Sequence, residues 1–538
     1  MIIGLGLSNV RVFDDAHSEF PFTRVSVLCG TNSAGKSTIV KSLLLLVQTH
    51  ALRSFETIGQ IRFTGPLVDL GGFESLVSHR DVSRDITISL RTVDLIRSNL
   101  LGPLRKIKNK AQDAKGGEGE FEAYSLDSSY RFGLIESRSE TASVEPPLPF
   151  DVGLPLSRTW TKGAYLKEAS FHLETTDDLQ LDWSISLRSK SLKKLETPEY
   201  EILIPSSYFE AVGGYNAVDV ERVDPGSYVR LECLMQGLVV DSLWVKLLLP
   251  KGDEEYYDTT SYPAPPIIRA ISSDLGTELT EVHYIGPLRS PAKRLYIDKS
   301  DINSFLDTAG EFLPQILKER GDMRIDFIPP PVDSEQIEAT LSQAVSVWLH
   351  YLRTGHTITV KEGTLQPEID TSSVKDVIVE LTLKSFDEER YSLADSGFGY
   401  SQLLPIIVRG LIAAYDDTVI IEQPEVHLNP ALQVRIAEFL YALARSKRNV
   451  IIETHSEHIV NTLRILAAES TEEEMSGECT ILYLSTETGH PVLKRLEVQD
   501  DGTVPEWPRE FMGEAMRLAS RLLKAQDCLV DKGSKGAE

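Results

Sequence analysis

The chain has 538 residues, 41% hydrophobic content and a formal net charge of −25, so we expect two or three globular domains that as a whole repel nucleic acid. No window approaches the roughly 18 to 20 apolar residues of a membrane span, and the first ten residues lack the pattern of a secretory signal. We therefore expect a cytoplasmic protein without membrane contact. The four cysteines are widely spaced without a C-x-x-C pair, which argues against a disulfide framework or a zinc cluster.

A phosphate loop is the first motif along the chain. Residues 1–13 alternate as a first strand does, and the apolar run at 24–29 is typical of a buried parallel strand. Residues 30–38 (GTNSAGKST) then fit the pattern G-x-x-x-x-G-K-[ST] in full, and a helix is predicted over 38–48. Strand, glycine loop and helix N-terminus together favour binding of a nucleotide triphosphate.

The loop residues have separate expected roles. Gly30 and Gly35 let the backbone bend closely around an anion. Lys36 is expected between the β- and γ-phosphates of ATP, and the Ser37 hydroxyl in the shell of Mg²⁺. The positions predicted to contact the nucleotide are Gly30, Asn32, Ser33, Ala34, Gly35, Lys36, Ser37 and Thr38.

A long insertion is expected after the loop. Repeated short strands between 130 and 249 predict an antiparallel β lobe, and helices are predicted near 266–280, 302–319 and 335–352. Two basic clusters, at 105–115 and 188–194, are candidate local contacts to nucleic acid, although a solvated charged face is the commoner explanation of such runs.

A glycine-containing string follows a strand expected near 374–383. Residues 392–402 (SLADSGFGYSQ) precede a helix predicted at 403–414, with Ser401 and Gln402 at its start. A hydroxyl and backbone N–H groups there could bind a phosphate oxygen. A glycine turn that caps a helix explains such a string more often, but its place among the other motifs favours nucleotide contact.

Two buried strands with polar ends come next. Residues 418–421 lead to Glu422, which is expected to hold Mg²⁺ through water, with Gln423 and Glu425 close behind. Residues 449–453 form another strand, followed by His455, which could contact the γ-phosphate. A lone histidine is more often structural, but this one is in register with three other motifs.

Taken in order, these motifs resemble those of ABC- and SMC-type ATPases, in which the signature serine contacts the γ-phosphate held by the opposite protomer. More narrowly, the strings EQPEVHLNP, ETHSEH, HYIGPLR and DGTVPEWPREF resemble a bacterial family of single-chain SMC-like ATPases. Some relatives of that family serve in Septu-type and retron-associated anti-phage systems beside an HNH nuclease.

The resemblance implies an α/β P-loop NTPase of ABC/SMC type with a mixed sheet, an antiparallel β lobe and a helical insertion. It implies a homodimer or higher oligomer around ATP and Mg²⁺, with Lys36 of one chain facing Ser401 of the other, and a separate HNH-type nuclease effector. The expected division is residues 1–95 and 374–475 for the ATPase core, 96–373 for the insertion and 476–538 for C-terminal strands and a helix.

One position departs from the ABC pattern. The residue after the magnesium-binding acid is usually a glutamate that polarises the attacking water, and here it is Gln423. We therefore expect slow hydrolysis, or dependence on Glu425 or His455 as the base.

Two other functions stay open. A nuclease of the overcoming-lysogenization-defect type would add a metal-dependent Toprim domain, but Glu497, Asp500 and Asp501 form no convincing metal cluster. A transporter ATPase subunit would have a much smaller insertion.

Overall fold

The computed structural model describes residues 1–53, 59–95, 123–135, 163–176, 179–187, 200–206, 228–233, 235–240, 244–248, 261–294, 296–297, 307–352, 357–364, 377–384, 390–395, 398–470, 478–487, 490–499, 501–505, 507–508, 513, 517–518 and 520–524. Outside these residues lie the two basic clusters, residues 396–397 of the glycine-containing string 392–402, and Asp500. None of the described helices is long and apolar enough to cross a membrane.

A six-stranded sheet forms the centre of the fold. Its order is β14 (Val282–Ile285), β21 (Thr418–Glu422), β22 (Asn449–Glu453), β3 (Val25–Gly30), β23 (Cys479–Glu487) and β24 (His490–Glu497). The first five strands are parallel and β24 is antiparallel to β23. The sheet is therefore mixed, and the strand that precedes the phosphate loop lies between two strands from the C-terminal part of the chain.

Helices cover both faces of this sheet. One face packs against α1 (Lys36–Ala51) and α6 (Pro266–Thr280), and the other against α9 (Phe398–Ile412), α10 (Pro430–Arg445) and α11 (Glu457–Glu469). Side chains alternate along each strand, so Ile420 and Ile451 join the α1 side, whereas Ile421 and Ile452 join the α9 side. The strands are thus buried on both faces, as their continuous apolar runs predict.

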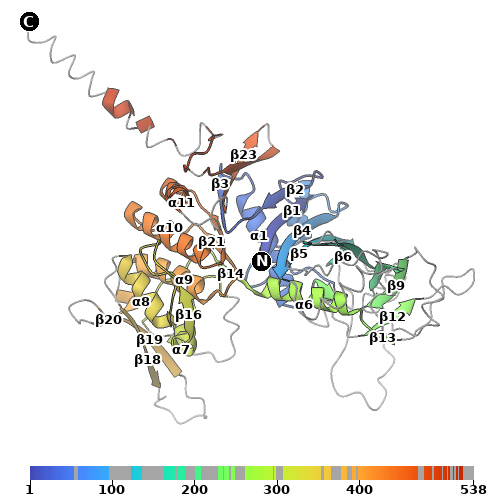
Figure 1. Cartoon of the computed structure of the whole chain (residues 1–538), viewed down its shortest axis with the longest axis horizontal. Coiled ribbons are helices and arrows are strands. Elements are labelled where there is room, and N and C mark those ends of the chain that lie inside the picture. The colour runs from blue at the N-terminus through green and yellow to red at the C-terminus, as the bar shows by residue number, and fades with distance from the viewer. Residues whose placement is uncertain are drawn as a thin grey trace, which may run out of the picture.

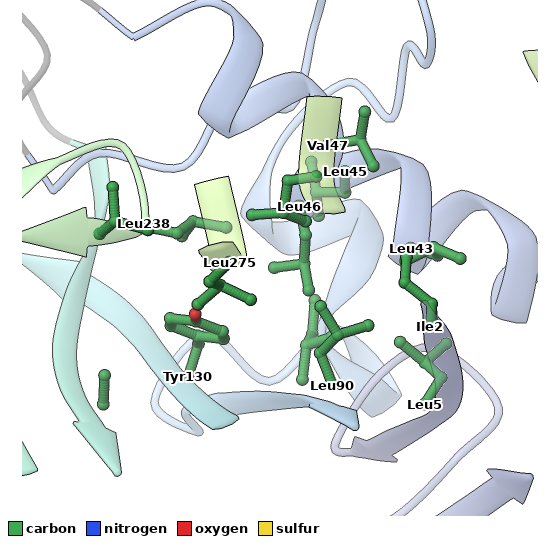
Figure 2. Close-up of a cluster of buried hydrophobic side chains, with 14 of the residues drawn as sticks. Ile2, Leu5, Leu43, Leu45, Leu46, Val47, Leu90, Tyr130, Leu238 and Leu275 are labelled. Atoms are coloured by element: carbon green, nitrogen blue, oxygen red, sulfur yellow. The ribbon is translucent and has the colours of Figure 1, made fainter. Parts of the chain in front are cut away.

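A ten-stranded antiparallel sheet packs on the far side of α1 and α6 (Figure 1). Its order is β13 (Ser261–Pro263), β12 (Trp244–Leu248), β9 (Tyr228–Cys233), β8 (Tyr200–Pro205), β7 (Gln180–Leu187), β6 (Gly163–Thr175), β5 (Ala123–Ile135), β4 (Ile86–Leu95), β1 (Ile2–Ser8) and β2 (Ser18–Pro21). Figure 2 shows the apolar layer between this sheet and the two helices, and its labelled side chains include Leu43 and Leu46 of α1, Leu275 of α6, and Leu5, Leu90 and Tyr130 of the sheet.

The remaining elements are short and lie mainly beside α9 and α10 (Figure 1). They are α7 (Leu313–Arg320), α8 (Leu341–Tyr351), β15 (Tyr296–Ile297), β16 (Arg324–Phe327), β17 (Ile337–Thr340), β18 (Thr357–Thr364), β19 (Val377–Lys384), β20 (Arg390–Ser392) and the 3₁₀ turn η5 (Leu393–Asp395). Elsewhere are α2 (Phe73–Leu76), η2 (Ser78–Arg80), β10 (Met235–Gln236) and β11 (Val239–Val240). Trp348 of α8 packs edge-on against Phe439 of α10 at 5.0 Å between ring centroids, which joins this part to the core.

The predicted fold class is confirmed: the chain is an α/β P-loop NTPase with a mixed sheet, a large antiparallel sheet and several helices. Local differences have local causes. The helix expected over 335–352 begins only at Leu341, because residues 337–340 pair with β16 as strand β17. Thr340 then caps α8, since its side chain and that of Gln343 form a reciprocal capping box.

The sheets do not follow the expected division of the chain. The boundary after residue 95 falls between β4 and β5, although every residue of β4 pairs with β5. Strand β14, expected in the insertion, and strand β23, expected in the C-terminal segment, both pair within the core sheet. This arrangement depends on hydrogen bonds between strands that are distant in the sequence. The local periodicity of the sequence does not indicate which strands pair.

Candidate active site

The phosphate loop packs tightly against other parts of the chain. Gly30 has φ +126°, and a Cβ there would lie 1.9 Å from the carbonyl oxygen of Leu484 on β23. Gly35 has φ +108°, and a Cβ there would lie 2.7 Å from the Phe13 ring. Ser33 between them also takes a left-handed conformation, with φ 63°. Both glycines are therefore required by the loop's own packing as well as by any ligand.

Lys36 lies inside this loop. Its Nζ donates hydrogen bonds to the carbonyl oxygens of Gly30 at 3.1 Å and Thr31 at 2.7 Å, and the residue is 4% exposed. Burial lowers the pKa of Lys36, whereas the negative charge of Glu453 acts in the opposite direction. The loop carbonyls thus hold the Lys36 ammonium at the place where the phosphates of a nucleotide would bind. This position fits the role expected from the sequence.

Two carboxylates stand beside Ser37 at the ends of neighbouring strands. Glu422 ends β21 and Glu453 ends β22, and the strand register places them side by side. The Ser37 hydroxyl donates to Glu453 Oε1 at 2.9 Å, and the Tyr284 hydroxyl donates to Glu422 Oε1 at 2.9 Å. Burial, and then the charge of Glu453, raise the pKa of Glu422 to about 7. The structure therefore brings Ser37 and Glu422 to one acidic pocket, as their expected metal role requires.

Three members of this pocket were not predicted from the sequence: Glu453, Tyr284 and Arg289. Arg289 is 5% exposed, and its Nη2 donates to the carbonyl oxygens of Glu422 at 2.9 Å and Gln423 at 3.4 Å. Its Nε and Nη1 have no hydrogen-bond partner, and burial lowers its pKa to about 10. A signal existed for Glu453, which ends an apolar strand as Glu422 does. Tyr284 and Arg289 belong to the string HYIGPLR, which marked only a family resemblance.

Gln423 and Glu425 lie in the turn that follows β21. Gln423 is left-handed, with φ 46°, and its backbone N–H donates to the Glu453 carbonyl at 2.7 Å. A non-glycine residue in this region is uncommon, so the turn geometry is held by its surroundings. The Glu425 carboxylate accepts from the Thr454 hydroxyl and from the His455 backbone N–H, both at 2.8 Å. Glu425 therefore fixes the loop that carries the expected switch histidine.

His455 projects from that loop and is exposed to solvent. Its partial desolvation, and then the positive charge of Lys36, lower the pKa of His455. The next residue, Ser456, caps α11 by accepting from the Ile459 N–H at 3.1 Å. A neutral imidazole is thus presented near the phosphate loop, the position that its expected contact with a γ-phosphate requires.

Ser401 and Gln402 lie elsewhere in the fold. They are in the first turns of α9, 7% and 2% exposed, and Gln402 Nε2 donates to Ser401 Oγ at 3.4 Å. Helix α9 packs on the face of the core sheet opposite α1, which begins with Lys36. A single chain therefore brings together the phosphate loop, Glu422, Gln423, Glu425 and His455, but presents the signature residues on the other face.

A family model described as an AAA ATPase domain matches residues 291–460, which contain Ser401, Glu422 and His455 but not the phosphate loop. Together with the phosphate loop that packs against this segment, the match makes the chain a P-loop ATPase, which confirms that part of the sequence prediction. The oligomer, the effector and the defence role stay predictions.

No curated protein matches the sequence. Three similar solved structures are heads of SMC proteins. The first is an Smc head bound to the C-terminal winged-helix domain of ScpA, with 10% identity, coverage of 92% of this chain and 98% of that chain, and a TM-score of 0.34. The second is an Smc head with an extended coiled coil bound to the C-terminal domain of ScpA from Pyrococcus furiosus, with 9% identity, coverage of 97% and 99%, and a TM-score of 0.35. The third is an SMC head from Thermotoga maritima, with 9% identity, coverage of 92% and 99%, and a TM-score of 0.34.

Among the described residues, no group of three or more His, Cys, Asp or Glu is arranged to hold a metal ion.

Proposed function

We propose that the chain binds ATP with Mg²⁺, hydrolyses it slowly, dimerises around it as ABC/SMC-type ATPases do, and thereby controls a separate effector. The observation that carries this proposal is the hydrogen bond of 2.9 Å between Ser37 and Glu453, because it joins the phosphate loop to the strand-end carboxylates within one pocket. Lys36 and the loop N–H groups would bind the phosphates, and Ser37 with Glu422 would hold the metal. When bound, ATP would supply the phosphoryl group, and Mg²⁺ would supply positive charge to offset the negative charge of the phosphates.

Slow turnover is supported by the residues around the expected water site. Gln423 replaces the usual glutamate, and an amide is a far poorer base than a carboxylate. Both oxygens of Glu425 already accept hydrogen bonds from the loop that carries His455. Of the two ionisable candidates for the base, Glu425 is already hydrogen-bonded and His455 is exposed to solvent. We therefore expect the protein to remain ATP-bound for long periods.

Dimerisation is supported by the placement of the signature residues. Ser401 and Lys36 belong to helices on opposite faces of the core sheet. A second chain would be needed to bring a signature serine to each phosphate loop, which gives a homodimer with two shared sites.

The effector is proposed from the family resemblance of residues 422–430, 453–458, 283–289 and 501–511. Those strings support an HNH-type nuclease partner in a cytoplasmic anti-phage system. Co-expression with the product of a neighbouring HNH gene tests this part: co-purification that depends on ATP is expected, and independent behaviour of the two proteins would contradict it.

Light scattering with and without ATP tests the dimer. The parent should double in mass with ATP, whereas Ser401→Ala should bind ATP as a monomer. Alanine is preferred to a larger residue because Ser401 is buried. Ser273→Ala, on the exposed surface of α6, is the matched control and should dimerise normally. If Ser401→Ala doubles in mass with ATP as the parent does, the shared-site arrangement is wrong.

A further inference from the structure

The pairing of Glu422 with Glu453 places two carboxyl groups beside one phosphate loop. The residues two positions earlier, Ile420 and Ile451, pack in the apolar cluster that contains α1. Because side chains alternate along a strand, both carboxyl groups point to the same face, toward the N-terminus of α1. They are 4% and 2% exposed, so water screens them little.

The hydrogen bonds of this pocket leave one oxygen unsatisfied. Glu453 Oε1 accepts from Ser37, but Glu453 Oε2 is buried and has no hydrogen-bond partner. The Lys36 ammonium donates to the carbonyl oxygens of the loop. A buried carboxylate oxygen without a partner is unfavourable unless a hydrogen-bond donor or a cation satisfies it. The Ser37 hydroxyl and the two neighbouring carboxyl groups therefore form a cluster of oxygen atoms, which is the donor type that a hard cation prefers.

We propose that Glu453 is a ligand of the Mg²⁺ ion, together with Ser37 and Glu422, so that two strand-end carboxylates hold the metal instead of one. This inference rests on the proposed function, because the metal enters with ATP. Mg²⁺ takes oxygen ligands and usually combines one or two carboxylates with hydroxyl, water and phosphate oxygens. Ser37, Glu422 and Glu453 offer this set.

A purely structural role for Glu453 makes a different prediction. In that case its carboxylate would only orient the Ser37 hydroxyl through their hydrogen bond of 2.9 Å. Glu453→Gln separates the two roles, because the amide oxygen can still accept from Ser37 while the negative charge is lost. The substitution also removes the repulsion between two buried acids, so it should not impair folding.

The test is Mn²⁺ binding, followed by electron paramagnetic resonance, to the full chain saturated with a non-hydrolysable ATP analogue. Glu453→Gln should weaken Mn²⁺ binding by at least about 10- to 100-fold, the range that loss of an outer-shell partner of a metal site already produces. Glu453→Ala is a second variant and should show at least the same loss. The matched control is Glu457→Gln in the first turn of α11, which should bind Mn²⁺ as the parent does.

Nucleotide binding measured with Mg²⁺ and again in EDTA keeps the two hypotheses apart. Failure of the parent to bind the labelled analogue in the presence of Mg²⁺ would contradict the proposed function itself. If the parent binds and either Glu453 variant takes up Mn²⁺ with parental affinity, the metal assignment is wrong while the nucleotide site stands. If the Glu453 variants retain analogue binding in EDTA and lose Mn²⁺ affinity, Glu453 holds the metal.

Discussion

Glu422 should make the nucleotide-free protein less stable as the pH rises. Burial and the charge of Glu453 raise its pKa from 4.5 to about 7. Between these two values the folded chain keeps a proton that the unfolded chain releases, so the free energy of unfolding falls with increasing pH. Glu422→Gln removes this titration and retains an oxygen that can accept from the Tyr284 hydroxyl.

The expected gain follows from the shift. At about 1.4 kcal/mol per pKa unit, Glu422→Gln should stabilise the nucleotide-free protein by about 3 kcal/mol at pH 8 and by only about 1 kcal/mol at pH 5. Thermal unfolding in EDTA at both pH values measures this. Glu469→Gln, the same change at an exposed position, should have no effect at either pH. An equal gain at both pH values, or a loss at pH 8, would refute the account of the carboxylate pair.

Three further outcomes are expected. Lys36→Ala should abolish binding of a labelled ATP analogue, because backbone donors alone would face the phosphates, and unchanged affinity would show that the loop is not the nucleotide site. Gln423→Glu should accelerate phosphate release by up to the roughly 100- to 10,000-fold of general-base catalysis. An unchanged rate there, with turnover abolished in Glu425→Gln, would instead assign the base to Glu425. Gln48→Leu should lower stability by on the order of 3 kcal/mol in thermal unfolding, because the buried Gln48 side chain hydrogen-bonds four backbone groups of residues 62–68. A parental melting temperature would contradict this last estimate.

Features written into short stretches of sequence were predictable. The phosphate loop, the strand ending at Glu422 and the helix of residues 266–280 were each expected within a residue or two of where they lie. Their signals are the glycine spacing, the length of an apolar run and the helical period, all of which are local.

Features that depend on which strands pair were not predictable. Glu453 becomes a neighbour of Glu422 only because β22 lies between β21 and β3. Tyr284 and Arg289 reach the same pocket because β14 joins the opposite side of β21. No local pattern within residues 282–289 indicates that this segment belongs to the ATPase core, since the pairing spans more than a hundred residues of chain.

The position of β3 has a consequence for the way the protein is made. Both neighbours of this strand, β22 and β23, leave the ribosome only after roughly 420 more residues have been synthesised, which takes roughly 20 to 80 s at 5 to 20 residues per second. Until then the apolar strand β3 has neither neighbouring strand. The carbonyl oxygen of Leu484, which accepts a hydrogen bond from the Thr31 N–H, has not yet been synthesised. A nascent chain that ends before β22 should therefore fail to retain ATP and should require protection from aggregation, although it contains the whole phosphate loop.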